Sequence, residues 1–226
     1  MIYIIGDSHV SIFSGTDTTH NGLRHIQPEF GTCYTLSQGA LRSPINKFEQ
    51  RIPYFCPIKI GSNTAWNSYD KLPIIEQAIQ EYEITKKDYI FACFGEIDIR
   101  NHIGIQNDKN NLGLKVNIES CVNRYFKTIL YLNNKYLNVG VYGSPPSSVG
   151  WKDTFGYKDV ITRNNMTLLF NNYLKEKCIT HNIIFKDISN FMIKEDGSTD
   201  EAFIMDDIHL SQKAIPLLIE EFKDLL

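Results

Sequence analysis

The sequence lacks the patterns that mark disulfide-rich, zinc-binding and membrane-spanning proteins. It has no CxxC pair, and its cysteines are odd in number and widely spaced: Cys33, Cys56, Cys93, Cys121 and Cys178. Such spacing favours neither a disulfide framework nor a zinc site. The apolar run that follows Met1 is far shorter than a membrane-spanning helix, and it lacks the basic start of a signal peptide. We therefore expect a cytoplasmic protein with no membrane partner.

An excess of charge of one sign is also missing. Lys and Arg number 23 against 26 Asp and Glu, which gives a net charge of −3, and no long basic run occurs. A nucleic-acid partner is therefore not expected. Hydrophobic residues make up 42% of the 226 residues and charged residues 22%, which is typical of a soluble globular protein. Because the sequence contains no repeat, low-complexity tract or linker, residues 1–226 are predicted to form one domain.

Short apolar runs alternate with amphipathic stretches along the chain. The runs predict strands at residues 2–5, 54–60, 88–94, 138–142 and 183–185. Helical spacing of apolar residues predicts helices at 73–83, 118–130 and 158–180, a short helix after Ser8, and a final helix that Ser211 caps. The polar, Asn-rich stretch 101–117 is predicted to be a loop. Strands that alternate with helices indicate right-handed βαβ units, and hence an α/β fold with a parallel sheet.

Gly6-Asp7-Ser8-His9 follows the first predicted strand directly. The carboxyl ends of strands are where open α/β sheets place their ligands. A serine on a tight turn between a strand and a helix has an exposed oxygen, which suits a nucleophile. Asp7 is expected to tie this turn through backbone hydrogen bonds, and His9 to support the site rather than act as the base. Ser8 is therefore the first candidate catalytic residue.

A serine hydroxyl is a poor nucleophile at neutral pH, so Ser8 needs a base. The stretch Asp206-Asp207-Ile208-His209 near the other terminus offers His209 for that role. A carboxylate three residues earlier on a tight turn can reach one imidazole nitrogen and leave the other facing Ser8. The alternative is a histidine that caps a helix or makes a buried hydrogen bond and takes no part in catalysis.

A GDS motif near the N-terminus and a DxxH motif near the C-terminus together resemble the SGNH (GDSL-like) hydrolase superfamily, and the resemblance spans nearly the whole chain. It implies a three-layer α/β/α sandwich, flavodoxin-like, with parallel strands in the order 2-1-3-4-5. It also implies a serine esterase or acyltransferase with Ser8 as nucleophile, His209 as base and Asp206 as the residue that orients the base. The block that begins at Gly95 and ends at Arg100 is similar to the GEID-x-R block of a GDSH-type branch.

Members of this superfamily stabilise the reaction's oxyanion with three donors: the nucleophile's own N–H, the N–H of a glycine after the second strand, and an asparagine side chain after the third. The Ser8 N–H fits the first role. Gly61 fits the second, since it has no side chain to block a substrate oxygen, although an ordinary turn glycine is the alternative. Ile97 occupies the third position and cannot donate. Asn63 and Arg100 are both candidate replacements.

Glu96, Asp98 and Arg100 alternate just after a predicted strand, which places charges at the sheet edge near Ser8. Arg100 is expected either to pair with Glu96 or Asp98 or to hold an anionic substrate. An ion pair that pins the loop is the favoured interpretation for Glu96, and Asp98 remains a candidate substrate-binding residue. The chain has no HxH or HExxH spacing, so neither a metal nor another cofactor is expected.

The predicted function is the removal of a small acyl group, acetyl in the first instance, from a carbohydrate ester. Aromatic residues in the loops after strands can form a platform for a sugar: Trp66, Tyr69, Trp151, Phe155 and Tyr157. Two alternatives stay open. One is an O-acyltransferase that uses the same triad and a sugar hydroxyl as acceptor. The other is a non-catalytic carbohydrate-binding module on the same scaffold, which the missing asparagine donor supports.

Overall fold

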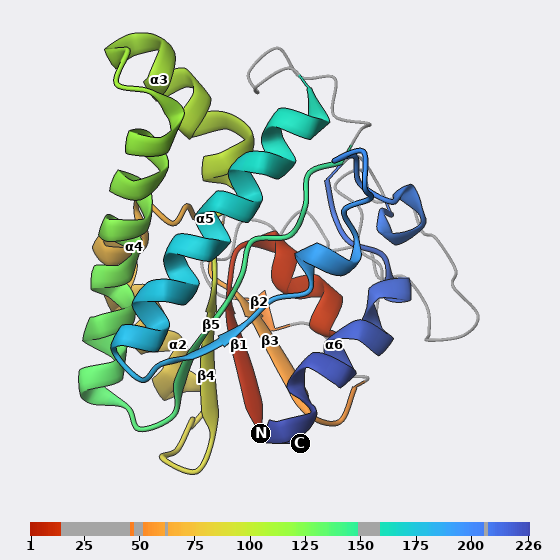
Figure 1. The fold of residues 1–226 in the computed structure, drawn as a ribbon. Helices are drawn as coiled ribbons and strands as arrows, with labels where there is room; N and C mark the ends of the chain where they lie inside the picture. The colour runs from red at the N-terminus through yellow and green to blue at the C-terminus, as the bar shows by residue number, and fades with distance from the viewer. Residues whose placement is uncertain (15–45, 48–51, 62, 149–158, 206–207) are drawn as a thin grey trace.

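The structure is a computed structural model of the whole chain (Figure 1). It describes residues 1–14, 46–47, 52–61, 63–148, 159–205 and 208–226. The predicted site residue Asp206, three of the loop aromatics (Trp151, Phe155 and Tyr157) and Cys33 lie outside these ranges.

A six-stranded sheet forms the centre of the molecule. Its order is β2-β3-β1-β4-β5-β6, with bounds β1 Ile2–Gly6, β2 Asn46–Lys47, β3 Phe55–Lys59, β4 Tyr89–Cys93, β5 Val139–Tyr142 and β6 Ile184–Lys186. All neighbouring strands are parallel except β2, which pairs antiparallel with β3 at the edge. Counted along the chain, the five parallel strands have the order 2-1-3-4-5, so the predicted topology is confirmed. The two-residue strand β2 was not predicted, because it lies in a stretch with no clear periodicity.

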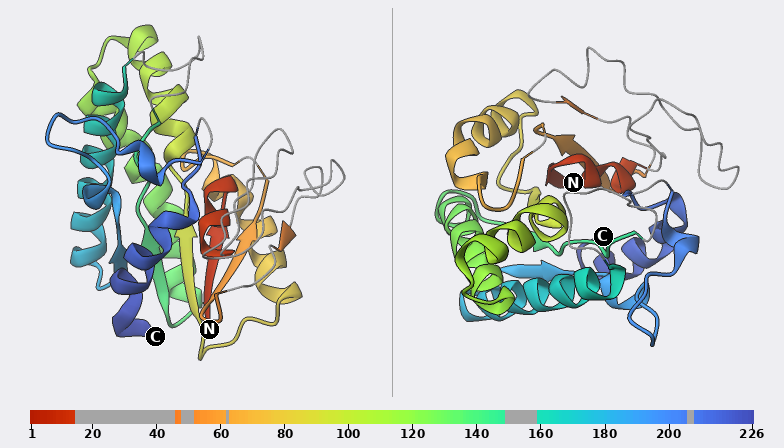
Figure 2. Two further views of the ribbon diagram at one scale, coloured as in Figure 1. Left: turned by 90° about the vertical axis from the view of Figure 1, so that its right-hand side faces the viewer. Right: turned by 90° about the horizontal axis from the view of Figure 1, so that it is seen from above.

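Helices cover both faces of the sheet (Figure 2). The α-helices are α2 Leu72–Glu81, α3 Ile103–Asn110, α4 Leu114–Lys135, α5 Val160–Thr180 and α6 Ile215–Phe222. Residues of α2, α4 and α5 pack with Ile5, Ile90 and Val141 in one hydrophobic cluster. The helix after Ser8 and α6 pack with Ile4 and Phe91 in a second cluster. Because alternate residues of a strand face opposite sides, the two clusters lie on opposite faces of the sheet and give three layers.

Shorter helical segments connect these elements. The described ranges contain six 3-10 helices, at Ser8–Ser14, Ser68–Lys71, Ser189–Phe191, Glu201–Phe203, Gln212–Ala214 and Lys223–Leu225, and one π-helical turn at Asp98–His102. Ser211 Oγ accepts a hydrogen bond from the Lys213 N–H, and Pro216 falls in the first turn of α6. Ser211 thus caps the 3-10 helix Gln212–Ala214, which leads directly into α6, rather than α6 itself. None of the helices in the described ranges combines the length and apolar character needed to span a bilayer.

The prediction of a loop over residues 101–117 is wrong. This stretch contains the end of the π-helical turn, all of α3 and the beginning of α4. Its helical character is hidden in the sequence because α3 buries only Ile103 and Gly104. The buried Asn117 side chain compensates by hydrogen bonding with Asn110 and the Gly113 carbonyl, which ties α3 to α4. Tertiary contacts therefore stabilise a helix that lacks a continuous apolar face.

Candidate active site

Ser8 lies at the carboxyl end of β1, as its motif predicts. It opens the 3-10 helix Ser8–Ser14, immediately after the turn at Asp7. The Asp7 N–H donates to the Cys93 carbonyl at 3.3 Å, and the Asp7 carboxylate accepts from the His9 N–H at 2.9 Å. The prediction that Asp7 ties its turn is therefore confirmed. Since β4 ends at Cys93, the turn that carries Ser8 is anchored at the centre of the sheet.

The structure brings His209 to Ser8 from the other end of the chain. His209 Nε2 lies 2.9 Å from Ser8 Oγ, a hydrogen-bond distance across 201 positions of sequence. The imidazole is buried, with 2% of the residue exposed. A base in this position can accept the hydroxyl proton as the oxygen attacks. The two motifs that sequence analysis singled out therefore meet in space.

Backbone hydrogen bonds to residues 203–205 hold His209 in place. The Met205 N–H donates to the His209 carbonyl at 2.9 Å, and the Ser211 N–H donates to the Phe203 carbonyl at 2.8 Å. Ile204 and Leu210 form an isolated antiparallel bridge beside them. Asp206 lies outside the described residues. Its role as the carboxylate that orients His209 stays a prediction.

A buried charge network lies directly behind the Ser8–His209 pair. His9 Nε2 is 3.1 Å from Glu96 Oε2, and Arg100 Nε donates to Glu96 Oε1 at 2.7 Å. The His9 ring also faces the His209 ring, with the two centroids 5.0 Å apart. The sequence left open whether Arg100 pairs with Glu96 or Asp98 or holds an anionic substrate, and the structure shows the pair with Glu96. The contact between His9 and Glu96 was missed, because 87 positions separate them.

Burial and neighbouring charges act in opposite directions on the Glu96 carboxyl group and the His9 imidazole. Burial opposes a charged Glu96, but the His9 and Arg100 charges and hydrogen bonds lower the pKa of its carboxyl to about 2. Burial also opposes a charged His9, yet the neighbouring Glu96 and Asp7 carboxylates raise the pKa of the imidazole above its usual value. Asp7 differs, because burial raises its pKa to about 6 in spite of His9. The Glu96 carboxylate therefore favours the protonated form of the His9 imidazole, which lies next to the candidate nucleophile in the chain.

Replacing Glu96 with glutamine is expected to lower the free energy of unfolding by about 3 kcal/mol. The substitution keeps the side chain's shape but leaves the buried Arg100 without its countercharge, which is costly inside a protein. Urea unfolding followed by circular dichroism measures the effect. Glu76→Gln is the matched control, since Glu76 pairs with Lys135 at the surface and its loss should cost less than about 1 kcal/mol. Equal stability changes in the two variants would show that the buried Glu96 network stabilises the fold no more than a surface ion pair does.

Asp98 does not point at Ser8 but fastens a neighbouring loop. Its carboxylate accepts from the Ala65 N–H at 2.6 Å and from the Trp66 N–H at 3.2 Å. Burial raises the pKa of Asp98 to about 7, against the lowering effect of these two backbone donors. The loop after β3, which carries Gly61, is thereby tied to the segment after β4. Asp98 acts here as a structural anchor, and its predicted role in substrate binding stays a prediction.

Gly61 and Asn63 occupy the loop that the sequence associated with the oxyanion. Gly61 has a φ of +82°, which favours glycine, and a Cβ added there would meet nothing within 4 Å. The space beside Gly61 is therefore open to a substrate oxygen. The Asn63 amide donates to the Ile60 carbonyl, and Arg100 Nε is engaged with Glu96. Both candidate replacements for the missing donor at Ile97 thus make hydrogen bonds within the protein.

The described residues contain no group of three or more His, Cys, Asp and Glu side chains placed to hold a metal ion. The four cysteines in the described ranges, Cys56, Cys93, Cys121 and Cys178, are buried and form no disulfide with one another. The site is thus built from the hydroxyl of Ser8, the imidazole of His209 and the buried network behind them.

Comparison with solved structures identifies the fold. A GDSL-like lipase from Bacteroides thetaiotaomicron superposes with a TM-score of 0.60 over 99% of this chain and 86% of its own, at 9% identity. A catalytic mutant of an acetylxylan esterase from Geobacillus stearothermophilus superposes with a TM-score of 0.50 over 99% of this chain and 92% of its own, at 13% identity. No protein-family model and no curated protein matches the sequence. The chain therefore has the fold of the SGNH/GDSL-like hydrolases, at identities that establish the fold alone.

Proposed function

We propose that the protein is a serine ester hydrolase that removes a small acyl group, acetyl in the first instance, from a carbohydrate ester. The observation that carries the proposal is the 2.9 Å separation between His209 Nε2 and Ser8 Oγ at the carboxyl end of a parallel sheet. A serine paired in this way with a buried imidazole is the arrangement that activates a hydroxyl for attack on a carbonyl. The shared fold with a GDSL-like lipase and an acetylxylan esterase supports the same chemistry.

The proposed reaction has two halves. Ser8 Oγ attacks the acyl carbonyl while His209 Nε2 takes the hydroxyl proton, and the tetrahedral oxyanion is held by the N–H groups of Ser8 and Gly61. The C–O bond to the alcohol then breaks, and His209 returns the proton to the departing alcohol. Water attacks the acyl-enzyme, gives its proton to His209 and releases the acid, and the proton returns to Ser8. Asp206 is proposed to orient His209 and to stabilise its charged form.

One observation favours a second candidate function. Ile97 occupies the position of the asparagine donor, so a site with fewer oxyanion donors is also compatible with a non-catalytic carbohydrate-binding module. An O-acyltransferase uses the first half-reaction unchanged and passes the acyl group to a sugar hydroxyl instead of water. Adding an acceptor sugar to the hydrolysis assay distinguishes the acyltransferase from the esterase, because a transferase forms an acylated acceptor at the expense of free acid.

Intact mass after exposure to a fluorophosphonate tests the proposed function. The reagent reacts with activated serines, so the wild-type protein should gain the mass of one adduct and Ser8→Ala should gain none. Denatured wild-type protein is the control for reaction that does not need the assembled site. No adduct on the native protein, under conditions that label a known serine esterase, would overturn the enzyme proposal in favour of the binding module.

A further inference from the structure

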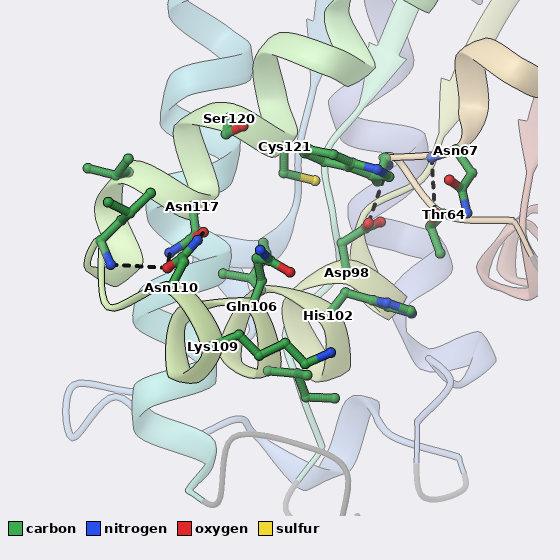
Figure 3. Close-up of a pocket in the computed structure, with 15 residues that line it drawn as sticks. Thr64, Asn67, Asp98, His102, Gln106, Lys109, Asn110, Asn117, Ser120 and Cys121 are labelled. Carbon is green, nitrogen blue, oxygen red and sulfur yellow. Dashed lines mark hydrogen bonds between the residues drawn. The ribbon is translucent and has the colours of Figure 1, made fainter.

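A cavity of about 370 Å³ opens between the loop after β3, the turn before α3, α3 itself and the first turns of α4 (Figure 3). This volume lies within the range of small-molecule binding sites, about 300–1,000 Å³. Its lining includes several hydrophobic residues that stay exposed to solvent: Trp66, Ile105, Leu112 and Val116. The cavity is therefore accessible. It did not emerge from the sequence, because α3 was predicted to be a loop.

The polar side chains that line the cavity are mostly uncharged. The Asn67 and Gln106 amides and the Ser120 hydroxyl belong to exposed residues and make no side-chain hydrogen bond to any described residue, so they can exchange water for a ligand. Amides and hydroxyls both donate and accept, so together they match a ligand that is rich in hydroxyl groups. Lys109 is the one ammonium and Asp98 the one carboxyl group of the described lining, which gives little net charge to attract an ionic ligand. A fatty acyl chain would leave the three polar groups without partners.

Trp66 supplies a fixed aromatic surface in this lining. The Arg124 guanidinium carbon lies 4.9 Å from the centroid of the indole, and Arg124 Nε donates to the Trp66 carbonyl at 2.6 Å. The Trp66 N–H also donates a hydrogen bond to the Asp98 carboxylate. The residue nevertheless remains 42% exposed. A sugar presents a face of weakly positive C–H groups, which pack favourably on the electron-rich face of an indole.

The cavity shares its walls with the candidate active site. The loop that begins at Gly61 continues into the lining at Thr64 and Trp66. The segment that contributes Asp98 to the lining also carries Glu96, whose carboxylate contacts His9 next to Ser8. The cavity and the candidate active site are therefore built on the same two segments, the loop after β3 and the segment after β4.

We propose that this cavity binds the sugar of the ester substrate and holds it while Ser8 attacks the acyl group. The inference rests on the proposed function and deepens it, because it assigns the alcohol portion of the ester to a named site. The hydroxyl groups of the sugar pair with the free amides and hydroxyl of the lining, and its C–H face packs on Trp66. The same site binds the deacylated sugar as product.

Two variants and one control test the proposal in an ester assay. Trp66→Ala removes the aromatic surface, and Gln106→Leu removes a polar partner at similar side-chain volume, whereas Gln80→Leu changes an exposed glutamine on α2. The substrates are mono-O-acetyl methyl glycosides and p-nitrophenyl acetate, which has no sugar. We expect kcat/KM for the glycoside ester to fall about 10-fold more than kcat/KM for p-nitrophenyl acetate in each cavity variant. Gln80→Leu should change neither value, and equal losses on both esters in the cavity variants would overturn the proposal.

A binding assay keeps the proposal separate from the esterase assignment. Saturation-transfer NMR is recorded on Ser8→Ala protein with unacylated methyl glycosides, so no turnover is needed. We expect a glycoside signal that Gln80→Leu preserves and that Trp66→Ala and Gln106→Leu both remove. A signal that survives the two cavity variants, or no signal from any glycoside, would overturn the sugar site. If the wild type hydrolyses neither ester, the proposed function fails, and this second assay still decides what the cavity binds.

Discussion

Ser8→Ala and His209→Ala are each expected to lower kcat for ester hydrolysis by about 10⁶-fold, and the double variant is expected to be no worse than either single one. The physical reason is that nucleophile and base act as one unit: without Ser8 Oγ the imidazole has no proton to take, and without His209 Nε2 the hydroxyl stays a poor nucleophile. The 2.9 Å contact between these two atoms is the structural basis of the prediction. Single-turnover and steady-state hydrolysis of an acetyl ester measure the effect.

Ser11→Ala is the matched control, because Ser11 is a buried serine on the same 3-10 helix as Ser8. It should retain activity within a few-fold of the wild type, and its thermal unfolding should report any general damage to that helix. Losses that multiply in the Ser8→Ala, His209→Ala double variant would contradict the prediction, since they would mean that the two residues act independently.

Gly6→Ala is expected to destabilise the protein by about 4 kcal/mol or more. A Cβ at Gly6 would lie 2.0 Å from the Cys93 carbonyl oxygen and 2.9 Å from Val10 Cγ1. The first contact is with the backbone of the paired strand β4, so relief requires β1 and β4 to separate at the centre of the sheet, just before Ser8. Overpacking against backbone costs more than overpacking against a flexible side chain. Urea unfolding and soluble yield measure the loss.

Gly61→Ala is the control that separates the effect of replacing a glycine by alanine from the steric clash expected at Gly6. An added Cβ at Gly61 meets no atom within 4 Å, and only its φ of +82° opposes the substitution. A left-handed conformation costs a non-glycine residue about 1–2 kcal/mol, so Gly61→Ala should be clearly more stable than Gly6→Ala. If the stability of the Gly6→Ala protein lay within 1 kcal/mol of the wild type, β1 and β4 would have to accommodate the added Cβ beside Cys93, and the prediction would be wrong.

Local sequence patterns were sufficient to predict most of the sheet and the helices. The strand prediction at residues 88–94 became β4 at Tyr89–Cys93, and the helix prediction at 158–180 became α5 at Val160–Thr180. Both succeed because burial on a sheet or a helix face leaves a short-range periodic signal. The strand order 2-1-3-4-5 came from the family resemblance rather than from periodicity. Periodicity fails for the stretch 101–117, because α3 has few buried residues to repeat at helical spacing. This helix is stabilised instead by hydrogen bonds with Asn117 of α4.

The sequence by itself determined the candidate nucleophile and the candidate base. Ser8 follows a buried strand in a short motif, and His209 stands in a second motif, so both could be selected from residue types and local spacing. Sequence reasoning also singled out Arg100, either as the partner of Glu96 or Asp98 or as a residue that holds an anionic substrate. What it could not provide was distance, because the separation between two residues in space depends on how the whole sheet is ordered.

Only the tertiary structure decided which groups meet. It placed His209 Nε2 beside Ser8 Oγ, joined His9 to Glu96, and turned Asp98 toward the backbone of Ala65 and Trp66. Each contact joins segments from different strands or from opposite ends of the chain, so no local pattern encodes it. The parallel sheet gathers the carboxyl ends of these strands at one edge, and burial there requires every charge to find a partner. Packing and electrostatic pairing, rather than local propensity, therefore fixed the site.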